Sequence, residues 1–540
     1  MAIISDASSL FSSKSFLIVD DFQGMRSMMR EMLKAFGAKD IDMCSNGSEA
    51  IAQIGKSKYD VVLCDYNLGS GRNGQQVLEE AKFRNLIGPS TAWIMVTAEK
   101  TSEMVLGAAE YTPDDYIIKP INETTIKTRI LKAMAKKEAL FDIEKAAKAK
   151  NHTKALALCD EQLKNAGSNT TELLRIKTNL LLSTSHYEGA KQLFEQILAV
   201  RDVPWAKTGL AKVYFQTADY DTARSLLEEV VEEHRSYLEA YDWLAKTLEQ
   251  IGELSEAQRV LVRCAELSPN SVMRQRTLGE IAQKRGDLDV AEKAFRKTLV
   301  LGEHSVLKTH HAYLGLAKIC SDKNNPAEAL KILSSVQKEF DSAETTLQAK
   351  VAEGMVYRKS GDLVNAKKVA QEVAATVKEI ANRVPSQISV EAAELMMETG
   401  DKESASELLQ MAVKNNHEDE KLISLVNGVY TKGNMQEEGK KLVEASRKEV
   451  AETNNRGISL AREGKLDDAV EMLRNAKTML PNNTRILMNL AYVMVLHMQK
   501  NGHNNTLIRE ARESVDRVAK LNPSEKRLSQ LVGMLEALPG

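Results

Sequence analysis

Short apolar runs that end in polar residues mark the first part of the chain. They are Phe16-Leu17-Ile18-Val19, Val61-Val62-Leu63-Cys64, Trp93-Ile94-Met95-Val96 and Tyr116-Ile117-Ile118. Continuous apolar runs of this length are typical of strands buried on both faces of a parallel sheet. Ile41–Cys44 has the same character and predicts a further short strand.

Between these runs, apolar residues recur at the spacing of an α-helix. Residues 24–36 show this most clearly and end at Gly37, a residue type that often terminates helices. Further helices are expected near 47–56, 74–87, 101–109 and 123–137. Strands alternating with helices predict a doubly wound, five-stranded α/β domain over residues 14–136, after an N-terminal tail at 1–13.

From residue 137 the strand signal ends, and pairs of amphipathic helices follow. Leu210, Leu244 and Leu278 are 34 residues apart, and each is followed by alanine or glycine. A fixed period of this size is the signature of stacked helical repeats, whereas an irregular helical bundle would show none. We therefore predict an all-α solenoid over residues 137–540, with a final helix at 524–538 that caps its open end.

The charge balance excludes one class of partner. Among 540 residues there are 73 Lys and Arg against 75 Asp and Glu, and 43% of residues are hydrophobic. Proteins that bind nucleic acid normally carry a strongly basic face. We therefore expect folded domains with no nucleic-acid partner and no DNA-binding output.

Cysteine usage and the N-terminus favour a cytoplasmic protein. The five cysteines are widely spaced and form no CxxC pair, which favours free thiols over zinc or disulfides. Residues 1–13 lack the basic and apolar segments of a signal peptide. No window of 18 apolar residues occurs, so no membrane insertion is expected.

Candidate chemistry gathers at the strand ends. Asp20 and Asp21, Asp65, Thr97 and Lys119 each follow or end a different predicted strand. A single aspartate there is more often a turn former or a helix cap. Three neighbouring carboxylates, however, repel unless a cation such as Mg²⁺ neutralises them. Lys119 and Thr97 would supply positive charge and a donor beside Asp65, so the set predicts a phospho-aspartate site.

In this order, these residues resemble the receiver domain of bacterial two-component response regulators, the CheY-like fold, over roughly residues 14–136. The resemblance implies the flavodoxin-like sheet order 2-1-3-4-5. It also implies that Asp65 is the phospho-acceptor. Asp20, Asp21, Asp65 and the backbone carbonyl of Asn67 would hold Mg²⁺.

The resemblance implies further roles around the acceptor. Thr97 would be the switch hydroxyl, Lys119 would contact the phosphoryl group and Tyr116 would change rotamer. Asn67 and Glu99 are similar to positions that tune dephosphorylation. The loop from Asn67 to Gly74 departs from the family pattern, because it has Gly69 where proline is frequent and holds one extra residue.

The 34-residue pattern is similar to the tetratricopeptide repeat, in which small residues let two antiparallel helices touch. Pro269 stands where that repeat often has its terminating proline. Stacked helix pairs form a concave groove that usually binds an extended or helical peptide. One or more protein partners in that groove are therefore expected.

Together, these patterns predict a phosphorylation-controlled adaptor with no dedicated enzymatic domain. A histidine kinase would phosphorylate Asp65, and the switch would alter protein binding by the repeats. One alternative is a phosphate sink that drains a shared kinase through its own aspartyl-phosphate hydrolysis. Another is a constitutive scaffold. The oligomeric state stays open, a dimer included.

Overall fold

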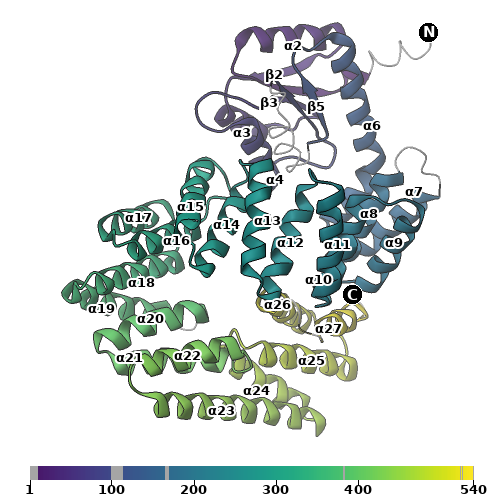
Figure 1. Cartoon of the computed structure of the whole chain (residues 1–540). Helices are drawn as coiled ribbons and strands as arrows, with labels where there is room; N and C mark the ends of the chain where they lie inside the picture. The colour runs from purple at the N-terminus through teal and green to yellow at the C-terminus, as the bar shows by residue number, and fades with distance from the viewer. Residues whose placement is uncertain are drawn as a thin grey trace. The chain divides into compact units, whose positions relative to one another are not determined.

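The computed structural model describes residues 10–98, 113–164, 170–380, 384–522, 525 and 527–538. The chain forms two compact units, Met1–Ala312 and Tyr313–Gly540. The first unit holds a parallel sheet with its flanking helices and a series of helix pairs (Figure 1). The second unit is helical in its described residues.

Five parallel strands form the sheet. They are β1 (Ser15–Val19), β2 (Asp40–Cys44), β3 (Val61–Asp65), β4 (Ala92–Thr97) and β5 (Asp115–Ile118). Their order is β2-β1-β3-β4-β5, and every neighbouring pair is parallel. This order confirms the doubly wound topology expected from the sequence.

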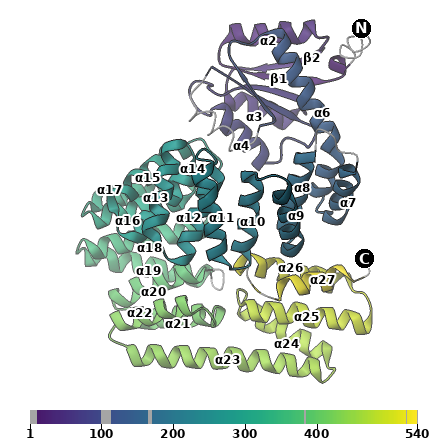
Figure 2. The same ribbon diagram turned by 45° about the vertical axis from the view of Figure 1, so that its right-hand side comes forward.

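Helices cover both faces of the sheet (Figure 2). The described ones are α2 (Gln23–Ala35), α3 (Gly47–Lys56), α4 (Gly74–Phe83) and α6 (Glu123–Lys148). Because strand side chains alternate, Phe16 and Ile18 enter one core, whereas Leu17 and Val19 enter the other. The expected helix at 101–109 lies outside the described residues.

Helix α4 is shorter than the sequence pattern predicted. Asn73 starts it with a capping box, in which its side chain and that of Gln76 each accept a hydrogen bond from the other's backbone. The helix ends at Phe83 rather than near residue 87, because Asn85 adopts a left-handed backbone with φ of 55°. Asparagine tolerates this conformation better than most residues.

The core of the sheet domain begins before β1. Phe11 is fully buried and stacks on Phe16, with their ring centroids 5.7 Å apart. Its ring also meets the edge of Phe36, which follows α2. The N-terminal segment around Phe11 therefore packs into the sheet domain rather than forming a tail up to residue 13.

Helix α6 joins the sheet domain to the repeats without a break. Ile126 and Ile130 pack under the sheet. Further along the same helix, Leu140 and Ile143 pack with the following helices. The predicted domain boundary at 136/137 therefore falls inside one continuous helix.

Helix pairs fill the rest of the first unit. They are α7 (His152–Leu163), α8 (Thr170–Ser183), α9 (Tyr187–Val200), α10 (Pro204–Gln216), α11 (Tyr220–Glu233), α12 (Leu238–Ile251), α13 (Leu254–Leu267), α14 (Val272–Arg285) and α15 (Leu288–Gly302). Small residues let the helices touch as expected. A Cβ on Gly209 would lie only 2.3 Å from the ring of Phe194 on the preceding helix.

The second unit continues the pairs from α16 (His310–Asp322). They run through α17 (Pro326–Glu339), α18 (Ala343–Lys359), α19 (Leu363–Ile380), α20 (Ser386–Thr399), α21 (Lys402–Asn415), α22 (Glu420–Lys432), α23 (Gln436–Arg462), α24 (Leu466–Met479), α25 (Thr484–Asn501), α26 (Asn505–Leu521) and α27 (Leu528–Glu536). Helix α27 lies within residues 524–538, where the sequence predicts a helix that caps the stack.

Helix α23 is longer than the other helices of the repeats. It is 27 residues long and contacts both α22 and α24. Its middle, around Lys448 to Arg456, contains neither glycine nor proline, so nothing in the sequence ends the helix between two repeats. Two consecutive helices of the repeat pattern are therefore fused into the single helix α23.

The five cysteines all lie in the described ranges, where they are buried and form no disulfide. Burial raises the pKa of the Cys44 thiol to about 11. None of the helices in the described ranges is both long and apolar enough to cross a bilayer.

Candidate functional site

Asp20 is the fully buried member of the acidic group at the sheet edge. It follows β1, and its backbone N–H donates to the carbonyl of Cys44 on the neighbouring strand. Oδ1 of Asp20 accepts from the N–H of Phe22 at 2.9 Å, which leaves Oδ2 directed at the site. Asp21, the next residue, is exposed.

Asp65 ends β3 and is only 7% exposed. The ammonium of Lys119 bridges the two buried carboxylates, at 2.7 Å from Asp65 Oδ2 and 2.8 Å from Asp20 Oδ2. The backbone of Lys119 is fixed as well, because its N–H donates to the carbonyl of Thr97 at 2.7 Å. Lys119 is therefore anchored where it can neutralise charge on Asp65.

The negative charge of Asp20 and Asp65 is only partly neutralised by Lys119. Burial raises the pKa of Asp65; Lys119 opposes this rise, and the nearby Asp20 carboxylate adds to it. For Lys119, burial would lower the pKa, but its hydrogen bonds to Asp20 and Asp65 outweigh burial and raise it. One ammonium thus does not fully compensate two buried carboxylates.

The acidic group fits a hard divalent cation. Asp20, Asp21 and Asp65 each offer a carboxylate oxygen, and these atoms lie within 4.8 Å of one another. Mg²⁺ takes oxygen ligands and often binds through one or two carboxylates while keeping several waters. Exposed Asp21 is open to solvent, so such waters have access. A bound cation would also offset the repulsion between Asp20 and Asp65.

Thr97 and Tyr116 lie on the two strands beyond β3. Thr97 ends β4 and is buried, and the register pairs Asp65 with its neighbour Val96. Tyr116 is half-buried on β5, where its hydroxyl finds no hydrogen-bond partner among the described residues. Burial, and to a lesser extent the nearby Tyr66, raises the pKa of Tyr116. An unsatisfied buried hydroxyl disfavours this position of the ring.

The loop after Asp65 is closely tied to it. The N–H of Asn67 is 3.4 Å from Asp65 Oδ1, and the Asn67 side chain accepts from the N–H of Gly69. Gly69 and Gly71 both have positive φ, which explains the two glycines in the loop that departs from the family pattern. Glu99, the other residue expected to tune dephosphorylation, lies outside the described residues.

Sequence reasoning missed two contacts that α4 makes within the first unit. Gln76 Nε2 donates to the carbonyl of Leu301 on α15 at 3.1 Å. Ser305 Oγ donates to Glu79 Oε1 at 2.5 Å, and both residues are only 7% exposed. In the sequence, the only indication of this contact was a charged residue, Glu79, on the side of the helix that faces the interior. The helix that begins beside Asp65 thus contacts the repeats.

Comparison with known proteins agrees with this architecture. The model of the response regulator receiver domain matches residues 16–131. Three tetratricopeptide repeat models match residues 181–247, 238–271 and 276–344.

Two chemotaxis proteins are similar to this chain over a stretch about as long as the receiver domain. Chemotaxis protein CheY-3 of Vibrio cholerae is 28% identical over 121 residues, which is 22% of this chain and 92% of that protein. Chemotaxis protein CheY of Pseudomonas aeruginosa is 27% identical over 116 residues, with the same shares.

Among solved structures, a CheY-like receiver domain protein from Methanospirillum hungatei is 26% identical. It covers 23% of this chain and 96% of its own, with a TM-score of 0.21. The family models show a response regulator receiver domain at residues 16–131 with tetratricopeptide repeats after it, and the strand order and the acidic group agree with them.

Proposed function

We propose that this protein is a phosphorylation-controlled response regulator whose output is protein binding by its repeats. Asp65 accepts a phosphoryl group from a histidine kinase. The change at the site then alters the affinity of the repeat region for a protein partner. Neither DNA binding nor a dedicated enzymatic domain takes part.

The observation that supports this proposal most is the bridge made by Lys119. A carboxylate accepts a phosphoryl group only where the negative charge of the transition state is neutralised. Lys119 is anchored within 2.8 Å of both Asp20 and Asp65, and Asp21 completes an oxygen set for Mg²⁺. When bound, Mg²⁺ would neutralise oxygens of the incoming phosphoryl group.

The transfer itself is a simple displacement. A carboxylate oxygen of Asp65 attacks the phosphorus of a phosphohistidine, a P–O bond forms and the P–N bond breaks, with its electron pair left on the imidazole nitrogen. Lys119 then pairs with the new phosphoryl oxygens, and the Thr97 hydroxyl donates to another. Tyr116, whose hydroxyl has no hydrogen-bond partner in the described part of the chain, follows by changing rotamer.

The contacts of α4 offer a route from the site to the repeats. The loop after Asp65 leads directly into α4, whose Gln76 and Glu79 bond to Leu301 and Ser305. A phosphoryl group adds charge and strong acceptors that favour a different arrangement of the surrounding loops. A few kcal/mol of differential contact, on the order of that provided by one or two charge-assisted bonds, is enough to shift such an equilibrium.

Phosphate incorporation tests the acceptor. Full-length protein is incubated with the small phosphodonor phosphoramidate and Mg²⁺, and phosphoprotein is separated by mass. We expect one phosphoryl group per chain, lost in Asp65→Ala while the helical repeats stay folded by circular dichroism. Undiminished incorporation in Asp65→Ala would refute the acceptor assignment.

Two measurements distinguish the switched adaptor from a phosphate sink and from a constitutive scaffold: the lifetime of the phosphoprotein and the identity of its protein partners. Rapid decay, together with affinity capture that recovers no partner other than a kinase, would favour the phosphate sink, in which Asn67 and Glu99 would matter most. A partner whose recovery does not change with the phosphoryl mimic beryllofluoride would favour a constitutive scaffold. A partner gained or lost with beryllofluoride supports the switched adaptor.

A further inference from the structure

A small cavity lies where α4 of the receiver meets the repeats, inside the first unit. It measures about 220 Å³. Its receiver side is formed by Tyr66, by Asn73 at the end of the following loop, and by α4. Its repeat side is formed by residues at the start of α14 and on α15. The remaining lining residues are Gln75, Gln76 and Glu79 on the receiver side, and Asn270, Val272 and Leu301 on the repeat side. The bonds from α4 to Leu301 and Ser305 join the same two sides.

Tyr66 is the lining residue that stands next to the acceptor in the chain. It directly follows Asp65, is only 9% exposed, and packs in the apolar core that α3 and α4 form with the sheet. Its carbonyl accepts the bond from the N–H of Gly74, which closes the loop of residues 67–73 and fixes the start of α4. A displacement of Asp65 therefore reaches Tyr66 through one peptide bond and α4 through one hydrogen bond.

Tyr66 also adjoins Tyr116, the aromatic residue that is expected to change rotamer. Tyr116 packs against the core to which Tyr66 belongs. The two phenols are close enough that Tyr66 adds to the raised pKa of Tyr116, for which burial is the larger cause. The Tyr116 hydroxyl has no hydrogen-bond partner among the described residues, so little holds it in place. A rotamer change of Tyr116 would alter the packing around Tyr66.

The cavity supplies the space into which Tyr66 can move. Protein interiors are close-packed, so a buried ring changes its position only where a void accepts it. This cavity is several times larger than the ~30 Å³ that one water molecule occupies in the liquid. It separates Tyr66 from Leu301 and from Val272, which is 4% exposed. A Tyr66 ring that moved into the cavity would contact these apolar side chains of the repeats.

We propose that Tyr66 couples phosphorylation of Asp65 to the repeats. In the phosphorylated receiver Tyr116 turns, the ring of Tyr66 moves into the cavity, and the contacts that α4 makes with Leu301 and Ser305 rearrange. Tyr66 is thus a positioning residue, which binds neither the phosphoryl group nor a partner. This inference rests on the proposed function and adds to it the residue and the cavity through which the switch acts.

Hydrogen exchange of full-length variants tests this role, with Mg²⁺ present and with or without beryllofluoride. In Tyr66→Leu the response of β3 to the mimic should persist, because Asp65 and Lys119 are intact. The response of residues 301–305 should shrink about fivefold or more, which is the lower end of typical coupling between two sites. Tyr66→Phe retains the ring and should respond at both places as the wild type does.

Two further variants distinguish coupling from general packing of the core. Tyr59→Leu removes a tyrosine that is 5% exposed in the same core but is not among the residues that line the cavity. It should keep both responses. Val272→Phe leaves the receiver sequence unchanged and fills the cavity from the repeat side. It should suppress the response at 301–305 while β3 still responds.

The proposal is overturned if Tyr66→Leu keeps the wild-type response at 301–305, if Tyr66→Phe loses it, or if Tyr59→Leu loses it equally. Should Tyr66→Leu not fold, Val272→Phe decides, and a wild-type response in that variant overturns the proposal. A wild type that shows no response at 301–305 would refute the proposed function together with this inference. A wild-type response that survives in Tyr66→Leu would refute the role of Tyr66 alone.

Discussion

Gly74, the first residue of α4, lies directly against the backbone of Asp65. A Cβ atom built on Gly74 would stand 1.9 Å from the Asp65 carbonyl oxygen. The N–H of Gly74 also donates to the carbonyl of Tyr66 at 2.8 Å. The start of α4 is thus fixed against the end of β3, which carries Asp65. A displacement of Asp65 would therefore displace the first turn of α4.

Substitution of Gly74 should therefore destabilise the receiver. In Gly74→Ala the added methyl group meets backbone atoms, which cannot rotate away, so a loss of about 1–3 kcal/mol is expected. Hydrogen exchange of peptides from β1 and β3 measures this loss of stability. Gly55→Ala in α3 is the control, since a Cβ there has nothing within 4 Å. Equal exchange in the two variants would contradict the account.

Asp65→Asn should stabilise the receiver in the absence of metal. Because the folded protein raises the pKa of Asp65, it disfavours the carboxylate that is present at neutral pH. The variant removes that cost above the folded pKa. The advantage should disappear below the ordinary carboxyl pKa, where Asp65 is neutral in both folded and unfolded chains. Exchange of β3 in a chelator, followed against pH, measures this difference.

Magnesium should make the wild-type receiver more stable than Asp65→Asn. A ligand that binds only the folded state adds about 2.7 kcal/mol at a hundredfold excess over its dissociation constant. Wild type has all three carboxylates of the acidic group, whereas Asp65→Asn lacks one and should gain less. Titration of both proteins with MgCl₂, read by exchange of β3, tests the cation site. An equal gain in both would remove Asp65 from the ligand set.

The repeats should show the same sensitivity to small residues as the receiver. Gly209→Ala places a methyl group 2.3 Å from the buried Phe194 ring, so we expect a loss of about 1–3 kcal/mol. Gly428→Ala lies within α22 with nothing nearby and should be neutral or stabilising by about 0.5–1 kcal/mol. Hydrogen exchange of the α9–α10 and α22 peptides compares the two. Similar effects would argue against close helix contact at Gly209.

The bond between Ser305 and Glu79 should hold α4 on the repeats. Ser305→Ala removes a hydrogen bond to a buried carboxylate, at a cost of about 1.5–3 kcal/mol to the contact. Exchange should rise in α4 and near Leu301. Ser334→Ala is the control, because that exposed hydroxyl bonds only to its own helix. Unchanged exchange in Ser305→Ala would show that the bond contributes nothing.

Local patterns could predict the strands and the residues at their ends, because buried parallel strands leave continuous apolar runs and their carboxyl ends share an edge. The 34-residue period likewise exposed the repeats. The contact of Glu79 with Ser305 joins residues 226 positions apart, and no local pattern encodes it. The length of α23 was not predicted, because the repeat pattern leads one to expect a turn in its middle. Only the absence of glycine and proline from that part of the sequence indicated a continuous helix.

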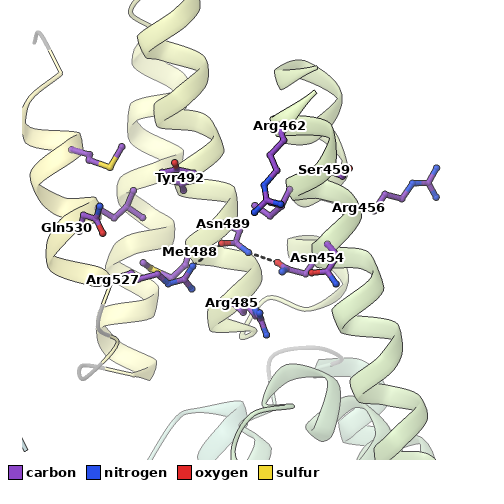
Figure 3. Close-up of a pocket in the computed structure, with 14 residues that line it drawn as sticks. Asn454, Arg456, Ser459, Arg462, Arg485, Met488, Asn489, Tyr492, Arg527 and Gln530 are labelled. Atoms are coloured by element: carbon purple, nitrogen blue, oxygen red, sulfur yellow. Dashed lines mark hydrogen bonds between the residues drawn. The ribbon is translucent and has the colours of Figure 1, made fainter. Parts of the chain in front are cut away.

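The cavity lined by α23, α25 and α27 (Figure 3) could not be predicted from the sequence for a related reason. Arg462, Arg485 and Arg527 belong to or precede three different helices and look like ordinary surface charges in the sequence. Only the stacking of α23, α25 and α27 places them around one space. Likewise, Phe11 lies before the first strand with no periodic neighbours, so its burial depends on the shape of the completed core.

Hydrogen exchange with and without beryllofluoride tests the central claim most directly. With Mg²⁺ present, the mimic should change exchange at β3 and α4 and also at Leu301–Ser305 in the wild type, and it should change none of them in Asp65→Ala. If the change in the wild type stopped within the receiver and left residues 301–305 untouched, the proposed coupling of phosphorylation to the repeats would be contradicted.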